Sequence, residues 1–262
     1  MPENFLVERD ATVATVIINR PEQRNAINYQ MWGELAHLLG GLDGDSGVRA
    51  VVITGAGDRA FSAGADISDF ETYRSDSVKG RDYNNAVDRL LKTCRDMGTP
   101  TISMIRGFAA GGGCELAVAT DLRIAAEGSS LGIPAARLGV TIGHQEMQGL
   151  LNLVGKGNAL YILLTGRLIG AEEALRMGLV NQVLPESELK EYTYQLAQEI
   201  ACLAPLSHAV NKRTMNQVLA KPMLSELTTE EADLPLTQFD TRDYREGYRA
   251  FLEKRTPNFI GE

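Results

Sequence analysis

The chain has 262 residues, of which 26 are Lys or Arg and 34 are Asp or Glu, so its formal net charge at pH 7 is -8. That length can bury a sizeable core. The contents of 44% hydrophobic and 23% charged residues exclude a disordered chain, a collagen or a coiled coil as starting points. Nucleic acid is not an expected partner, because binding a phosphate backbone needs a basic surface and this chain is acidic.

The three cysteines, Cys94, Cys114 and Cys202, are widely spaced and form no Cys-x-x-Cys pair. With the few histidines also far apart, no metal site is expected, and a reducing compartment is indicated. The first ten residues lack the basic-then-apolar pattern of a signal peptide. No apolar run approaches the ~18–20 residues that a membrane span needs. We therefore expect a cytoplasmic location and no membrane partner.

Hydrophobic periodicity predicts alternating strands and helices in the first two thirds of the chain. The predicted strands are 5–7, 13–18, 50–54, 101–105 and 121–125. Three helices are predicted in this part: one capped by Asn28, one at 76–97, and one that begins near Cys114 after a Gly-rich turn at 107–113. The rest of the chain is mostly helical, with helices predicted at 144–154, 158–165, 171–177, 187–202, 205–219, 224–236 and 241–253. This order predicts an α/β core over residues 1–195 and a helical C-terminal region over 196–262, which is either a separate lobe or an oligomerisation arm.

Residues 55–60 read Gly-Ala-Gly-Asp-Arg-Ala and match the dinucleotide-binding pattern G-x-G-x-x-G/A directly after a predicted strand. That mechanism requires a helix to start at once and to aim its N-terminus at a pyrophosphate. Residues 61–65 are turn-like instead, and a helix and two strands already precede the motif. The pattern therefore favours a Gly-rich loop that joins a strand to a short helix.

Five segments occur in order and at a characteristic spacing: residues 19–26, 60–67, 107–116, 168–180 and 246–255. Together they resemble the enoyl-CoA hydratase/isomerase (crotonase) superfamily over nearly the whole chain. The resemblance implies a crotonase-like spiral of ββα units with a helical C-terminal trimerisation region. It also implies an acyl-CoA substrate, no tightly bound cofactor, and a homotrimer or a dimer of trimers.

Acyl-CoA chemistry passes through negative charge on the thioester oxygen, which backbone N–H groups stabilise when they can approach closely. Small residues permit that approach. The resemblance assigns the two donors to Ala63 and Gly112, and Gly112 also lies where a helix begins, which favours an anion. The alternative is that glycines 111–113 only allow tight packing between a helix and a strand.

Glu115 follows Gly112 by three residues, in the first turn of the predicted helix. A carboxylate there can shuttle protons beside a thioester, and the resemblance makes it one of two catalytic glutamates; the alternative role is to stabilise the helix dipole. Asp66 fits an N-cap as well as a ligand contact. The residues that the resemblance assigns to substrate and CoA binding are Arg20, Arg24, Ala26, Ala63, Gly64, Ala65, Asp66, Ile67, Gly111, Gly112, Phe251 and Lys254.

The chain departs from the family pattern at Ala135, which occupies the position of the second glutamate. Adding water to an enoyl-CoA is served by two carboxylates that hold one water, so the sequence predicts weak or absent hydration of crotonyl-CoA unless another group completes the pair. His144 or Glu146, in an altered turn nearby, can fill that space; the alternative is a surface His and a helix-start Glu. His37 and His208 lie on helical patterns and are interpreted as solvated or structural.

The acyl pocket is expected between residues 66 and 95, where Phe70, Tyr73 and Tyr83 are candidates to line it. We therefore predict an acyl-CoA lyase or isomerase that uses Glu115 as acid and base. Because of Ala135, the alternatives are decarboxylation, carbon–carbon cleavage or thioester hydrolysis on the same fold. A non-catalytic binding homologue, including one that binds RNA, is the remaining hypothesis.

Overall fold

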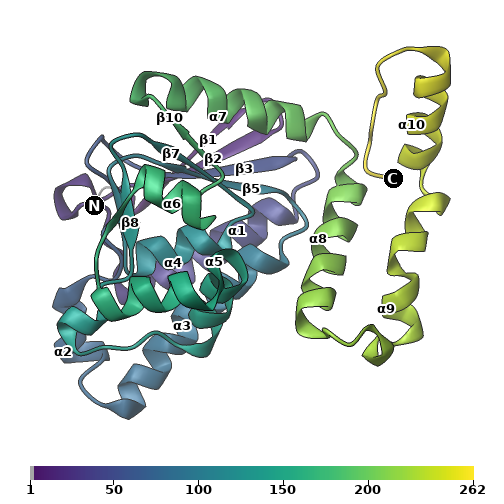
Figure 1. Ribbon diagram of the computed structural model, residues 1–262. Coiled ribbons are helices and arrows are strands. Elements are labelled where there is room, and N and C mark those ends of the chain that lie inside the picture. Colours follow the sequence, from purple (N-terminus) through teal and green to yellow (C-terminus); the bar gives the residue numbers. More distant parts are fainter. Residues whose placement is uncertain (1–2) are drawn as a thin grey trace.

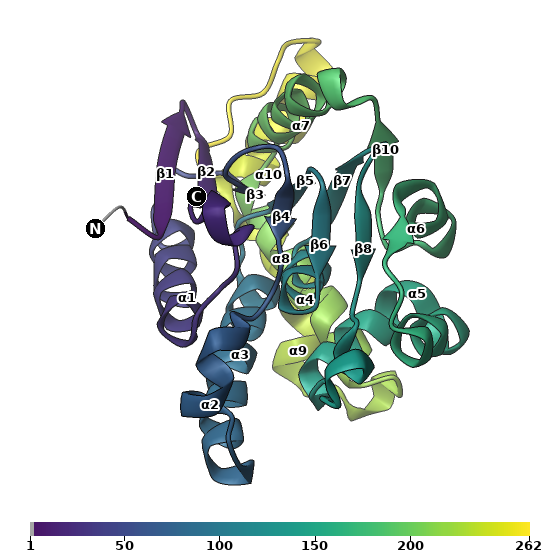
Figure 2. The same ribbon diagram turned by 90° about the vertical axis from the view of Figure 1, so that its left-hand side faces the viewer.

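The computed structural model describes residues 3–262, so residues 1 and 2 of the predicted core lie outside it. Two sheets form the core (Figures 1 and 2). The larger has the order β1-β2-β3-β5-β7-β10, and the smaller has the order β4-β6-β8-β9. The strands are β1 (Phe5–Asp10), β2 (Val13–Ile18), β3 (Ala50–Gly55), β4 (Ala60–Ser62), β5 (Thr101–Ile105), β6 (Phe108–Ala110), β7 (Leu122–Ala126), β8 (Ser130–Gly132), β9 (Ile169–Gly170) and β10 (Gln182–Leu184).

The chain repeats one pattern: a strand of the larger sheet, a strand of the smaller sheet, and then a helix. The repeats are β3-β4 followed by α3 (Ser77–Asp96), β5-β6 followed by α4 (Gly112–Ala119), and β7-β8 followed by α5 (His144–Thr165). Equivalent strands of successive repeats pair in parallel. The predicted spiral of ββα units is therefore confirmed.

Helices cover both faces of the larger sheet, which explains why its strands read as nearly continuous apolar runs. In β3, Val51 and Ile53 pack into the larger core cluster with α1 (Tyr29–Asp43), while Ala50 and Val52 face α7 (Glu186–Ala201) on the other side. Asn28 caps α1 as predicted, because its side chain accepts a hydrogen bond from the Met31 N–H at 3.0 Å.

Two predicted turns contain short strands, β4 and β6, each of three residues. They form because neighbouring turns of the spiral pair their backbones, and glycine-flanked segments this short carry no local strand signal. The helices predicted at 144–154 and 158–165 are the two halves of α5, which is kinked between them at Gly155, where φ is +70° and the backbone is not helical. The helix predicted at 224–236 is divided into the 3₁₀ helix Leu224–Glu226, α9 (Thr229–Asp233) and the 3₁₀ helix Leu234–Asp240.

The last helices form an arm that stands away from the sheets (Figure 1). It consists of α8 (Pro205–Ala220), α9 and α10 (Arg242–Glu253). The boundary expected at 195/196 falls inside α7, which packs on the larger sheet. Large apolar side chains of the arm are exposed in the single chain, among them Met215, Met223, Leu224, Leu236, Phe239, Phe251 and Leu252. Over the described residues 3–262, no helix has the length and apolar character needed to cross a membrane.

Candidate active site

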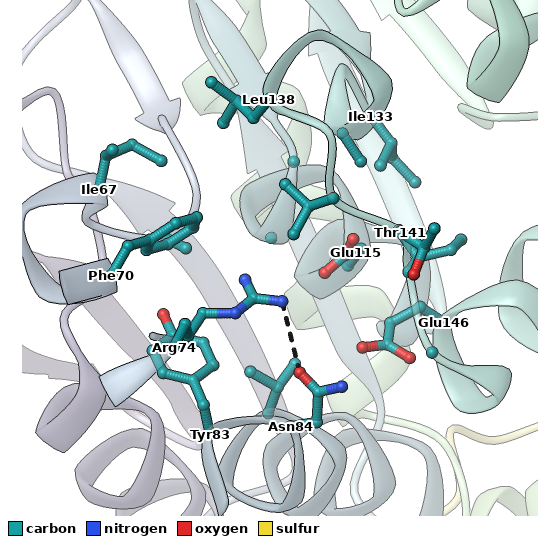
Figure 3. Close-up of a pocket in the computed structure, with 18 of the residues that line it drawn as sticks. Ile67, Phe70, Arg74, Tyr83, Asn84, Glu115, Ile133, Leu138, Thr141 and Glu146 are labelled. Carbon is teal, nitrogen blue, oxygen red and sulfur yellow. Dashed lines mark hydrogen bonds between the residues drawn. The ribbon is translucent and has the colours of Figure 1, made fainter. Parts of the chain in front are cut away.

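A cavity opens where the loop after β4, the start of α4 and the segment between β8 and α5 meet the helices α2 (Phe70–Tyr73) and α3 (Figure 3). Most of its wall is apolar. The larger apolar side chains are those of Trp32, Ile67, Phe70, Val87, Ile133, Leu138, Val140 and Ile142. The polar side chains are fewer: Arg74, Tyr83, Asn84, Glu115, Thr141 and Glu146. A mostly apolar cavity with a small number of convergent polar groups is the usual form of a small-molecule site.

The structure corrects the choice of Ala63 as a backbone donor to a ligand. Its N–H donates to the Arg24 carbonyl oxygen at 2.9 Å, so it is already used within the protein. The Ala65 N–H is not used in this way, because the residues on either side of Ala65 make the hydrogen bonds to Ile27. The Ile27 N–H donates to the Gly64 carbonyl oxygen at 2.8 Å, and the Asp66 N–H donates to the Ile27 carbonyl oxygen at 2.9 Å. The Ala65 N–H has no acceptor among residues 3–262. Successive N–H groups of an extended segment point in opposite directions, and sequence alone could not tell which of them faces the cavity.

Gly112 brings the start of α4 against this turn. A Cβ atom added to Gly112 would lie 3.5 Å from the Ala65 nitrogen and 2.7 Å from Cη2 of Trp32. As the first residue of α4, Gly112 has an N–H without a partner inside the helix, and none of the described residues accepts from it. Two free N–H groups therefore lie side by side at the cavity wall.

Gly64 permits the same close approach from the other loop. Its φ is +85°, which favours glycine, and an added Cβ would lie 2.4 Å from the Ala110 carbonyl oxygen and 2.7 Å from the Gly112 nitrogen. The two small-residue turns can meet only because this position has no side chain.

Glu115 lies one turn into α4 and lines the cavity with Glu146, which comes from the first turn of α5. Burial, with a smaller contribution from the charge of Glu146, raises the pKa of Glu115 to about 8, while the charge of Arg74 acts in the opposite direction. Burial is also the main cause that raises the pKa of Glu146. The Glu146 side chain is buried, and its Oε2 atom has no hydrogen-bond partner among the described residues.

These geometries agree with three comparisons with known proteins. A family model described as Enoyl-CoA hydratase/isomerase matches residues 8–262. The chain belongs to this enoyl-CoA hydratase/isomerase family. It is 36% identical over 252 residues to the short-chain-enoyl-CoA hydratase of Clostridium acetobutylicum, a match that covers 96% of this chain and 95% of that protein. It is also 36% identical to the crotonyl-CoA hydratase of Syntrophomonas wolfei, with 99% of each chain covered.

A solved structure agrees with the fold. The crystal structure of an enoyl-CoA hydratase/carnithine racemase from Magnetospirillum magneticum superimposes with a TM-score of 0.95 at 34% identity. The match covers 100% of this chain and 97% of that one. The predicted resemblance and fold class are thereby confirmed.

The departure from the family pattern has a counterpart in the cavity. Ala135, the first residue of a 3₁₀ helix, lines the cavity but has no carboxylate to offer. Glu146 reaches the same cavity from α5, whereas His144 is exposed and is not among the lining residues. Of the two residues predicted near the altered turn, the structure brings only Glu146 together with Glu115.

The other predicted binding residues fall into three groups. Ala65, Ile67, Gly111 and Gly112 line the cavity. Arg20 is held beside it, because its Nη1 donates to Asp66 at 2.9 Å and to the Ala26 carbonyl oxygen at 2.8 Å. Arg24 lies against Phe108, with its guanidinium 6.0 Å from the ring centre. Phe251 and Lys254 are in the arm and are not among the lining residues.

Asp66 has the predicted N-cap role, because its side chain accepts from the Ser68 N–H at 3.2 Å. Of the aromatic candidates, Phe70 and Tyr83 line the cavity. Tyr73 instead stacks on Tyr29, with the ring centres 4.4 Å apart. Within residues 3–262, no three His, Cys, Asp or Glu side chains group closely enough to hold a metal ion.

Sequence reasoning missed Trp32, Arg74, Asn84 and the nearby Asp88. The Trp32 Nε1 donates to the Tyr83 hydroxyl at 2.9 Å, which fixes one wall. Asn84 and Asp88 are one helical turn apart on α3. Asn84 follows the buried residue Tyr83, and Asp88 follows the buried residue Val87. Polar residues beside an apolar helical stripe were the available signal. Arg74 follows a helix of only four residues and carried no signal.

Proposed function

We propose that the protein is an acyl-CoA lyase of the hydratase type, which adds water across the double bond of a 2-enoyl-CoA thioester. The observation that carries this proposal is that Glu115 and Glu146 share one largely apolar cavity, beside the free N–H groups of Ala65 and Gly112. The names of the two hydratase relatives support it. Glu146 would supply the second carboxyl group that Ala135 lacks.

In this proposal the N–H groups of Ala65 and Gly112 bind the thioester oxygen. As the β-carbon is attacked, negative charge moves onto that oxygen, and a well-placed donor contributes about 3–4 kcal/mol to the transition state. These donors come from two backbone segments that already lie against each other at Gly64 and at the start of α4. They therefore need no reorganisation during the reaction.

The two carboxyl groups divide the proton transfers. With a pKa of about 8, Glu115 is protonated at neutral pH, and the charge of Glu146 is one cause of that value, so Glu146 is the group that ionises first. Glu146 accepts a proton from water, the water oxygen bonds to the β-carbon, and Glu115 gives its proton to the α-carbon. Proton transfer from Glu146 back to Glu115, directly or through water, restores the starting state.

The reaction is tested by following the loss of crotonyl-CoA absorbance with the wild-type protein, Glu115→Gln and Glu146→Gln. We expect each substitution to lower kcat by ~10²-fold or more, because an amide cannot exchange the proton. His144→Gln, at an exposed position two residues from Glu146, is the matched control and should keep wild-type turnover.

A wild-type protein that hydrates no enoyl-CoA would overturn the proposal, and so would a Glu146→Gln variant with full turnover. Products other than the hydrated thioester, on a panel of acyl-CoAs, would identify the alternatives of isomerisation, decarboxylation, carbon–carbon cleavage or thioester hydrolysis.

We also propose that the enzyme is cytoplasmic, binds no cofactor tightly and works as a homotrimer or a dimer of trimers. The exposed apolar side chains of the arm support self-association, since a single chain leaves Phe251 and Leu252 83% and 73% exposed. The three cysteines are free, and Cys94 and Cys114 are buried, which fits a reducing compartment.

A further inference from the structure

Arg74 is the one basic side chain among the residues that line the cavity. It follows α2, whose last turn fixes its backbone through a hydrogen bond from the Arg74 N–H to the Phe70 carbonyl oxygen at 2.9 Å. Its guanidinium lies 4.8 Å from the ring centres of both Phe70 and Tyr83. Figure 3 shows it extending into the cavity from the Phe70 side, while Glu115 and Glu146 lie on the other side.

The guanidinium has no carboxylate partner in the described chain. No Asp or Glu oxygen among residues 3–262 lies within ion-pairing distance of it. Its one side-chain hydrogen bond there is a long one, from Nη2 to the Asn84 Oδ1 at 3.5 Å. A guanidinium has five N–H donors in a fixed fork, so most of its hydrogen-bonding capacity is unused.

Arg74 and Asn84 also separate the cavity from a shallower groove on the outside. Both line that groove, together with Ser77, Arg81 and Asn85. The groove therefore adds a second arginine beyond Arg74 and no acidic side chain. Positive charge increases along this path, away from Glu115 and Glu146.

We propose that Arg74, assisted by Asn84, selects acyl groups that carry a carboxylate at the end remote from the thioester. This inference rests on the proposed acyl-CoA site and names the class of acyl group that it takes. A carboxylate matches the guanidinium fork in a bidentate manner, and the aromatic rings on both sides keep that fork flat and in place. The Asn84 side chain is free to turn its amide N–H groups to the same carboxylate.

A purely apolar acyl chain fits this end of the cavity poorly. It would cover the donors of Arg74 and Asn84 without replacing the hydrogen bonds that water makes to them, which is costly. A cationic acyl group would be repelled by Arg74. A carboxylate both satisfies the donors and neutralises the charge.

The test compares binding of saturated ligands, so that it does not depend on turnover. Dissociation constants are measured by titration calorimetry for glutaryl-CoA and adipyl-CoA, and for butyryl-CoA and hexanoyl-CoA as uncharged counterparts. We expect the better of the two carboxylated ligands to bind at least ~10-fold more tightly than its counterpart. Arg74→Met should abolish that preference without weakening the binding of butyryl-CoA.

Two further variants separate recognition from a general effect on folding. Asn84→Asp retains Arg74 but supplies a carboxylate from the protein, which occupies the guanidinium, so the preference should again be lost. Arg89→Met removes an exposed arginine from the same helix and should leave the preference intact. Thermal unfolding checks that all variants fold.

Equal affinities for the carboxylated and uncharged ligands in the wild-type protein would overturn the subsite, and so would a preference that survives Arg74→Met. If the preference is present but no enoyl-CoA is hydrated, the subsite stands and the proposed reaction fails. The two failures are therefore distinguishable.

Discussion

Glu115 and Glu146 reach the same cavity from helices α4 and α5, which belong to successive turns of the spiral. Each is in the first turn of its helix, where the helix dipole favours a negative charge. Burial nevertheless raises the pKa of both carboxyl groups, and the charge on Glu146 contributes to the value of about 8 for Glu115. Burial of the two carboxyl groups thus outweighs the helix dipoles, which would lower their pKa. A proton is therefore available in the site at neutral pH.

This raised pKa predicts that Glu115 costs stability at alkaline pH. Between the ordinary pKa of 4.5 and the folded value of about 8, the folded protein binds more protons than the unfolded one, so stability falls as pH rises through this range. Glu115→Gln removes the titration. The variant should therefore be more stable than wild type at pH 8.5, by about 2 kcal/mol or more, and the gain should shrink towards pH 5.

The measurement is the melting temperature of both proteins from pH 5 to pH 8.5. The same substitution at exposed Glu127 serves as the control, for which we expect no pH-dependent gain. A melting-temperature difference for Glu115→Gln that stays constant over this range would show that Glu115 is not held in a high-pKa state.

A second prediction concerns Gly112, where an added Cβ would lie 2.7 Å from Cη2 of Trp32. Trp32 is buried and its Nε1 is bound by Tyr83, so the start of α4 has to move instead. Gly112→Ala should cost about 1–3 kcal/mol of stability. It should also lower kcat at least tenfold, because the Gly112 N–H moves relative to Ala65.

Gly40→Ala is the matched control, because a Cβ there meets nothing within 4 Å and the position is inside α1. It should be neutral or stabilising by up to about 1 kcal/mol. Full activity in Gly112→Ala would argue against a requirement for this close approach.

Much of the fold could be predicted because its local signals agree with one another. β2 coincides with the predicted 13–18 strand, and α6 (Ala171–Met177) coincides with the predicted 171–177 helix, where Gly178 provides a left-handed C-cap. The strands β4 and β6 could not be predicted, since their stability comes from pairing between turns of the spiral. That pairing is a long-range interaction without a local pattern.

The site shows the same division. Glu115 and Gly112 carry a motif, so the sequence indicated both of them. The choice between the Ala63 and Ala65 N–H groups depended on which one Arg24 already engages, and this is a tertiary contact. Arg74 enters the cavity from the end of the short helix α2, whose Phe70 ring packs edge-on against Tyr83 of α3. No spacing rule relates it to Glu115.

The arm provides a third prediction. Phe251 is 83% exposed on α10 in the single chain, and a trimer that uses the arm would bury it. Phe251→Asp should lower the molar mass in light scattering towards that of one chain, because an unpaired charge in an apolar interface is strongly unfavourable. Val78→Asp is the control, since Val78 is 72% exposed on α3 outside the arm and should not affect assembly. A wild-type protein that is monomeric, or a Phe251→Asp variant that remains assembled, would contradict the prediction.

The last prediction concerns Lys254, which the sequence assigns to CoA binding, and its basic neighbour Arg255. The structure separates the two. Arg255 is bound by Glu246 through Nη1 at 2.5 Å and Nη2 at 2.8 Å, whereas Lys254 is exposed and forms no ion pair among residues 3–262. Lys254→Ala should therefore raise the KM for the acyl-CoA several-fold and affect kcat much less.

The increase in KM should grow as salt is lowered, because screening weakens exposed charge contacts. Lys156→Ala removes an exposed lysine of α5 and serves as the control for the overall charge. Initial rates at about 0.02 M and 0.3 M salt give the comparison. An unchanged KM of Lys254→Ala at low salt would exclude Lys254 from CoA binding. An equal increase in the KM of Lys156→Ala would attribute the effect to net charge rather than to a phosphate contact made by the arm.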